Sequence, residues 1–85
     1  MALFVIERHY AEQLQVTPDS ARLVGQINDD VGVHWLFSFL SADKRKTYCL
    51  YEAPNADAIR EAARRANLPA DVIVEVTELR PEAFT

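Results

Sequence analysis

Two stretches near the middle of the chain are apolar at both odd and even positions. The first spans residues 33–40 (Val-His-Trp-Leu-Phe-Ser-Phe-Leu) and the second spans residues 47–52 (Thr-Tyr-Cys-Leu-Tyr-Glu). Because alternate residues of a strand point to opposite faces, such a strand places apolar side chains on both faces of its sheet. The helices that an 85-residue chain can supply cover one face. We therefore expect a homodimer, in which a second copy of the chain covers the helix-free face.

The remaining segments indicate an order of strands and helices around these two strands. Thr17-Pro18-Asp19 is typical of a helix start, and Asn55 is typical of a residue that caps a helix. The expected elements are a strand over 2–10, a helix over 17–28, strands over 33–40 and 46–52, a helix over 55–66 and a strand over 71–79. The order βαββαβ predicts an α+β fold, a ferredoxin-like sandwich (alpha-beta plait). We expect one domain over residues 1–85, with a four-stranded antiparallel sheet and two helices on one face.

Residue spacing also predicts which side chains are neighbours. Trp35, Phe37 and Phe39 alternate and are expected on one face of their strand. In the second helix, Glu61 and Arg65 are four residues apart and are expected to pair.

The composition argues against several classes of partner. A formal charge of −4 and a pI near 5.0 disfavour binding to nucleic acid or to anionic membranes. The basic run Lys44-Arg45-Lys46 reads as the tip of a hairpin. The apolar run at residues 1–6 is shorter than the apolar core of a signal peptide and lacks a preceding basic region, so we expect it to form the first strand. No stretch reaches the roughly 20 apolar residues that span a bilayer. With a single cysteine, Cys49, the chain fits a reducing compartment, and we expect a cytoplasmic protein.

Three residues are candidate metal ligands. Glu7 and His9 are two apart on the first strand and therefore point to the same face. Imidazole and carboxylate groups suit divalent first-row metals, and His34 is a further imidazole donor. The remaining ligands would come from another strand, from water or from a partner subunit. The alternative interpretation is that Glu7 and His9 are half-exposed residues at a strand end and that His34 is a hydrogen-bonded or surface residue.

A second set of residues is a candidate ligand pocket between helices and sheet, composed of Trp35, Phe37, Cys49 and Tyr51. Its alternative interpretation is core or interface packing, which is the usual role of aromatic residues on a strand. Cys49 lies inside an apolar strand, between Tyr48 and Leu50, so packing is the expected role. No catalytic residue is identified by any motif. If the pocket were catalytic, His9 or His34 would carry protons near neutral pH.

The chain resembles a family of small bacterial proteins of largely unknown function that includes nickel-binding members. The resemblance rests on residues 4–8 (Phe-Val-Ile-Glu-Arg), 35–39 (Trp-Leu-Phe-Ser-Phe), 48–54 (Tyr-Cys-Leu-Tyr-Glu-Ala-Pro) and 59–65 (Ile-Arg-Glu-Ala-Ala-Arg-Arg). It implies a ferredoxin-like fold, a dimer and a divalent metal near the subunit contact. Relatives often carry histidine where this chain has Phe37 and Ala62, so the resemblance carries over Glu7 as a ligand.

Two functions of different classes follow from the sequence. The first is a small dimeric protein that binds nickel or another divalent metal near the subunit contact. The alternative is a small dimeric α+β enzyme, an isomerase or a cofactor-free monooxygenase, or a protein that binds a small hydrophobic ligand. The alternative rests on analogy between folds.

Overall fold

The structure, a computed structural model, describes residues 1–84. Its strands are β1 (Ala2–His9), β2 (His34–Leu40), β3 (Lys46–Ala53) and β4 (Val72–Val76), and its helices are α1 (Pro18–Val31), α2 (Ala56–Ala66) and the 3-10 helix η1 (Pro81–Phe84). The strands form one antiparallel sheet in the order β2-β3-β1-β4. This arrangement confirms the predicted ferredoxin-like βαββαβ sandwich.

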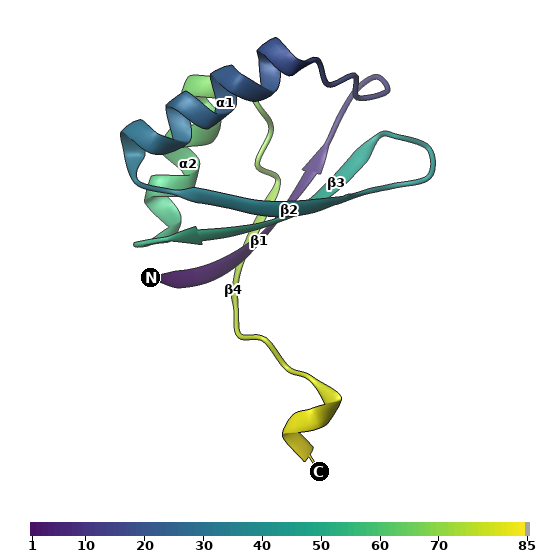
Figure 1. Ribbon diagram of the computed structural model, residues 1–85. Coiled ribbons are helices and arrows are strands. Elements are labelled where there is room, and N and C mark those ends of the chain that lie inside the picture. The colour runs from purple at the N-terminus through teal and green to yellow at the C-terminus, as the bar shows by residue number, and fades with distance from the viewer. Residues whose placement is uncertain (85) are drawn as a thin grey trace.

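Helices α1 and α2 lie together on one side of the sheet (Figure 1). The hydrophobic core lies between them and alternate residues of the central strands β1 and β3. Its buried members are Phe4, Ile6, Ile27, Val33, Cys49, Tyr51, Ala53, Ile59 and Ala62. We call the side of the sheet that carries the helices the helix side, and the opposite side the helix-free face.

Helix α1 starts where the sequence predicts and ends later. The Thr17 side chain accepts a hydrogen bond from the backbone N–H of Ser20, and the Ser20 hydroxyl accepts one from the backbone N–H of Thr17, which together form a capping box. The helix continues past Asn28, which is buried, to Val31, and Gly32 supplies the left-handed cap with φ 74°. The expected end near residue 28 is therefore about one turn too early.

Helix α2 follows the predicted pattern except for one ion pair. Asn55 caps it by accepting a hydrogen bond from the N–H of Ala58 at 2.9 Å. Glu61 pairs with Arg64, three residues on, at 2.5 Å. Arg65 instead reaches Asp30 of α1 at 3.1 Å, so the predicted pair of Glu61 with Arg65 is wrong. The neighbouring helix supplies Arg65 with a carboxylate that sequence spacing within α2 does not reveal.

The chain leaves the sheet after β4. This strand ends at Val76, three residues before the predicted end, and the following segment carries η1 away from the sheet (Figure 1). Leu79 and Phe84 are exposed there. Among the described residues, no helix has the length and apolar character needed to cross a membrane.

Candidate functional site

A β-bulge in β2 decides which side chains reach each side of the sheet. Trp35 lies opposite Tyr51, whereas Phe37 lies opposite Leu50, so two residues of β2 advance against one of β3. Trp35 therefore shares the helix side with Tyr51, while Phe37 and Phe39 lie on the helix-free face. The expectation that Trp35, Phe37 and Phe39 share one face is wrong, because alternation in sequence does not reveal the extra residue.

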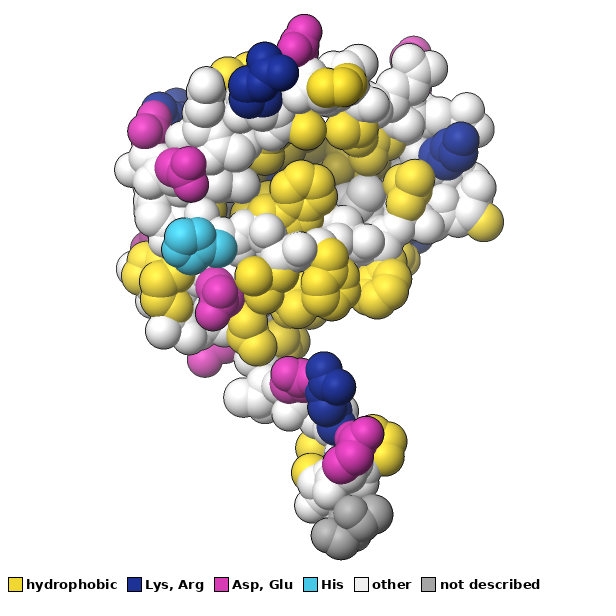
Figure 2. All heavy atoms as spheres, in the orientation of Figure 1, with side chains coloured by type: hydrophobic (Ala, Val, Ile, Leu, Met, Phe, Trp, Pro, Cys, Tyr) yellow, Lys and Arg dark blue, Asp and Glu magenta, His cyan; other side chains and the backbone are white. Residues whose placement is uncertain are grey.

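A cavity of about 350 Å³ opens between the helices and the helix side of the sheet. Figure 2 shows the hollow below α1 with hydrophobic side chains around it. Most of its walls are apolar. The apolar lining residues are Leu14, Val16, Ala21, Leu23, Val24, Trp35, Leu40, Ala66 and Leu68. A cavity of this size and character lies at the lower end of the range found for small-molecule sites.

The loop that follows β1 forms one wall of the cavity. The backbone N–H of Tyr10 donates to the Arg45 carbonyl at 2.8 Å, and the N–H of Leu14 donates to the Lys44 carbonyl at 2.7 Å. These two bonds attach the loop to the β2–β3 turn. As a result, Leu14 and Val16 are held over the end of the sheet, where they line the cavity.

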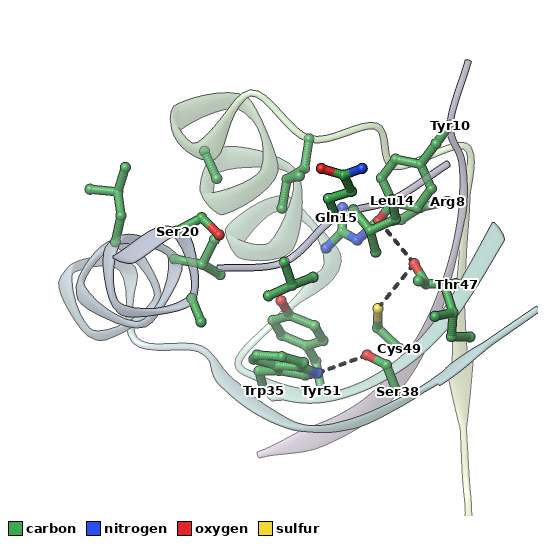
Figure 3. A pocket seen from close by; sticks show the side chains of 17 residues that line it. Arg8, Tyr10, Leu14, Gln15, Ser20, Trp35, Ser38, Thr47, Cys49 and Tyr51 are labelled. Carbon is green, nitrogen blue, oxygen red and sulfur yellow. Dashed lines mark hydrogen bonds between the residues drawn. The ribbon is translucent and has the colours of Figure 1, made fainter. Parts of the chain in front are cut away.

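The sheet supplies a polar wall to the same cavity. Arg8 of β1 and Thr47 of β3 are direct partners in the antiparallel register. The Thr47 hydroxyl lies 3.0 Å from the Tyr10 hydroxyl, and the Cys49 thiol donates to it at 3.5 Å. Figure 3 shows these side chains grouped on one side of the cavity, with Trp35 and Tyr51 beside them. The cavity thus combines apolar walls with one cluster of hydrogen-bonding groups.

Arg8 is the charged member of this polar wall, and its side chain is almost fully buried, with 3% of its surface exposed. Its Nη1 donates to the carbonyl oxygen of Pro69 at 2.5 Å, and its guanidinium carbon lies 5.9 Å from the centre of the Tyr51 ring. Within the described residues, no carboxylate lies within ion-pair distance of Arg8. Burial raises the pKa of the Tyr51 hydroxyl, although the positive charge of Arg8 opposes this effect.

The predicted pocket residues divide between the two sides of the sheet. Trp35, Cys49 and Tyr51 line the cavity. Trp35 is fixed at its wall by a hydrogen bond of 2.8 Å from its Nε1 to the Ser38 hydroxyl. Phe37 is not a lining residue, because the bulge turns it to the helix-free face, where its ring packs edge-to-face against Phe39 with the ring centres 5.6 Å apart.

The helix-free face is largely apolar. Its residues, read from the strand register, include Leu3, Val5, Phe37, Phe39, Tyr48, Leu50, Val72, Val74 and Val76. Large fractions of several of these side chains are exposed, reaching 66% for Phe39 and 49% for Val74. An apolar area that spans all four strands is unusual on the surface of a monomer.

Two of the three candidate metal ligands lie together at one end of this face. Nε2 of His9 lies 3.5 Å from Oε2 of Glu7 on β1. The backbone of the segment that carries both residues forms hydrogen bonds with Asp71. The Asp71 carboxylate accepts a hydrogen bond from the His9 N–H at 2.7 Å. The Asp71 N–H in turn donates to the Glu7 carbonyl at 3.1 Å.

His34 lies at the opposite end of the sheet. It faces Glu52 on β3, and Glu52 faces Leu3 on β1. Leu3 is four residues before Glu7, which corresponds to about 13 Å along a strand. His34 is therefore not brought together with Glu7 and His9 in one chain. Over residues 1–84, no group of three or more His, Cys, Asp or Glu side chains is arranged to hold a metal ion.

Sequence reasoning missed two residues. Arg8 has the same strand parity as the core residues Phe4 and Ile6, and this parity was the available signal for a buried charge. Asp71 precedes the last strand, and its contact with the backbone of β1 depends on strand pairing that sequence alone does not specify.

Comparisons with known proteins identify the family. The sequence model of a family described as "Nickel responsive protein SCO4226-like" matches residues 4–76. The chain belongs to the SCO4226-like family. This result confirms the resemblance to a small family with nickel-responsive members.

A solved member of the SCO4226-like family has a similar fold. The crystal structure of SCO4226 from Streptomyces coelicolor A3(2) superimposes with a TM-score of 0.71 at 26% sequence identity. The alignment covers 93% of this chain and 100% of the SCO4226 chain. Among curated proteins, none shows significant similarity to this chain. The SCO4226-like fold is thus shared over almost the whole length of both chains.

Proposed function

We propose that this protein binds a nickel(II) ion as a homodimer, with Glu7 and His9 as ligands near the subunit contact. The observation that carries the proposal is the 3.5 Å separation of the Glu7 carboxylate from the His9 imidazole on the helix-free face. Imidazole nitrogen and carboxylate oxygen are both suitable donors for a divalent first-row metal. Membership of a family described as nickel-responsive supports nickel as the metal.

One chain supplies an incomplete set of ligands in this proposal. Glu7 and His9 give two donors, and the described residues contain no cluster of three or more metal-ligating side chains. A two-fold symmetric contact places the same surface patch of both chains against each other. If the Glu7–His9 end of the sheet lies at that contact, two pairs provide up to four protein ligands, and water completes the coordination.

The apolar residues of the helix-free face support the choice of a second copy as the partner. Phe37, Phe39 and Val74 are each at least 49% exposed on this face. Contact with a second helix-free face would remove this apolar surface from water, and such burial contributes roughly 25 cal/mol per Å². The same contact would also remove the Glu7–His9 pair from bulk water. Electrostatic interactions of these two side chains are stronger at such a contact than in bulk water.

Asp71 would act through the backbone. Its two hydrogen bonds join it to the His9 N–H and to the Glu7 carbonyl, on the segment that carries both donors. Groups that orient metal ligands in this way typically influence metal affinity as well as structure. Asp71 is therefore a positioning residue in the proposed site.

Nickel titration by calorimetry tests the proposal, on protein purified without an affinity tag. A site shared by two chains predicts saturation at one nickel ion for every two chains. Glu7→Ala and His9→Ala each remove one donor from both chains, so each is expected to lower the nickel affinity by at least about tenfold.

His34→Ala is the matched control, because His34 is the other histidine and lies at the far end of the same sheet face. This variant is expected to bind nickel with unchanged affinity. The proposal fails if the unaltered protein gives no heat above the buffer background, or if Glu7→Ala and His9→Ala bind nickel as tightly as His34→Ala does.

A further inference from the structure

Arg8 is a buried charge at the wall of an apolar cavity, and no carboxylate of residues 1–84 pairs with it. A buried cation is costly unless an opposite charge or several hydrogen bonds compensate it. The Pro69 carbonyl and the Tyr51 ring provide part of this compensation. No aspartate or glutamate of the described chain pairs with Arg8, although most other arginines here form such pairs.

We propose that the cavity on the helix side binds a small amphipathic carboxylate, with its carboxylate against Arg8 and its apolar part along the Leu- and Trp-lined walls. The planar guanidinium of arginine matches a carboxylate and forms charge-assisted hydrogen bonds with it. The ligand would supply the negative charge that none of the described residues places beside Arg8.

The polar wall around Arg8 fits the head group of such a ligand. Thr47 lies directly opposite Arg8 in the strand register, and the Tyr10 hydroxyl lies 3.0 Å from the Thr47 hydroxyl. Figure 3 shows these groups on the same side of the cavity as Arg8. Hydroxyl groups beside a cation can donate further hydrogen bonds to a carboxylate.

The rest of the cavity fits an apolar body of limited size. Its volume of about 350 Å³ corresponds to the space of roughly a dozen water molecules. The other walls include Leu23, Val24, Leu68 and the indole ring of Trp35. A single arginine and this apolar lining favour a monoanion with a hydrocarbon body over a phosphate, which carries more charge and needs more donors.

This site is independent of the proposed metal site. Arg8 and Glu7 are neighbours in sequence but point to opposite sides of β1. A second copy on the helix-free face would leave the cavity on the helix side open. Metal binding and carboxylate binding can therefore be measured separately, and the failure of one does not decide the other.

The experiment uses ligands that share one hydrocarbon chain and differ in charge: decanoate, decanol and decylamine. Trp35 is the only tryptophan of the chain and lines the cavity, so its fluorescence reports binding directly. With a chelator present to exclude metals, decanoate is expected to bind saturably and at least about tenfold more tightly than decanol. Decylamine is expected to bind more weakly than both.

Arg8→Met removes the charge and keeps an apolar side chain of similar length. It is expected to abolish the preference for decanoate over decanol while leaving decanol binding unchanged. Arg65→Met is the matched control, because Arg65 is an exposed arginine of α2 that pairs with Asp30 and does not line the cavity. It should keep the full preference. Ala21→Phe fills the cavity and should weaken binding of both ligands.

Equal affinities of the unaltered protein for decanoate and decanol would overturn the proposal, as would the absence of a saturable fluorescence change. Retention of the preference in Arg8→Met would also overturn it. The comparison of the three ligands needs no variant, so the proposal remains testable if Arg8→Met does not fold.

Discussion

The guanidinium carbon of Arg8 lies 5.9 Å from the centre of the Tyr51 ring, on the neighbouring strand. Both side chains are buried, with 3% and 4% of their surfaces exposed. A cation over an aromatic ring at this distance is attracted by the negative face of the ring. The pair joins the polar wall of the cavity to the hydrophobic core, so changes at Tyr51 are expected to affect both stability and the cavity.

Alkaline pH tests the environment of Tyr51. Burial raises the pKa of the Tyr51 hydroxyl above the ordinary value of about 10. Below that value both the folded and the unfolded states keep the proton, so stability is independent of this group. As the pH rises toward the higher pKa of the folded state, the unfolded state binds fewer protons, and the free energy of unfolding falls.

Urea unfolding at about pH 9 and about pH 11 measures this loss. The unaltered protein is expected to lose more stability over this interval than Tyr51→Phe does. Absorbance at the tyrosinate band gives a second measurement, in which Tyr51→Phe should remove a late-titrating component. If that component persists in the variant, the assignment to Tyr51 is incorrect.

The two glycines of the chain are expected to respond oppositely to alanine. An added Cβ meets no atom within 4 Å at either Gly25 or Gly32. Gly25 lies inside α1, where alanine is favoured over glycine by about 0.5–1 kcal/mol, so Gly25→Ala should be stabilising. Gly32 has a φ of 74°, which alanine adopts with strain, so Gly32→Ala should be destabilising by about 1–2 kcal/mol.

Denaturant midpoints of the two glycine variants give the measurement, and each variant serves as the control for the other. If the midpoint shifts in the same direction in both variants, backbone conformation at the two glycines does not determine the effect of alanine.

The N-cap of α2 provides a further prediction. Asn55→Ala removes the acceptor for the Ala58 N–H and should destabilise the protein by about 1 kcal/mol. Asn55→Asp keeps a side-chain oxygen at the cap and should retain most of the stability. Thermal unfolding of the two variants distinguishes them, and equal losses would argue against the cap as the cause.

The sequence predicts elements with strong local signals, and those predictions hold. Thr17, Pro18 and Asn55 mark helix starts through hydrogen bonds and dihedral angles within a few residues, and the structure places both helices there. The fold class follows from the order of these elements. The expected end of α1 is about one turn too early, because the polar residue Asn28 is buried within the helix instead of ending it, and burial depends on tertiary packing.

The sequence predicts less of the candidate site than of the fold, because the geometry of the site also depends on tertiary contacts. The bulge between Trp35 and Phe37 reverses the parity of β2, and the alternation of aromatic residues gives no indication of it. The burial of Arg8 is indicated by its parity with the core residues Phe4 and Ile6, but the partners of its guanidinium depend on tertiary contacts that the sequence does not specify. The separation of His34 from Glu7 likewise follows from the strand register, which places His34 at the opposite end of the sheet.

In the proposed homodimer the helix-free faces of two chains pair with each other, and the mass in solution tests this pairing most directly. Light scattering at micromolar concentration is expected to give twice the 9.6 kDa of one chain. Val74→Lys places a charge on the exposed apolar face and should give a folded 9.6 kDa monomer, whereas Gln26→Lys makes the same charge change on α1 and should remain dimeric. A mass of 9.6 kDa for the unaltered protein would contradict the account.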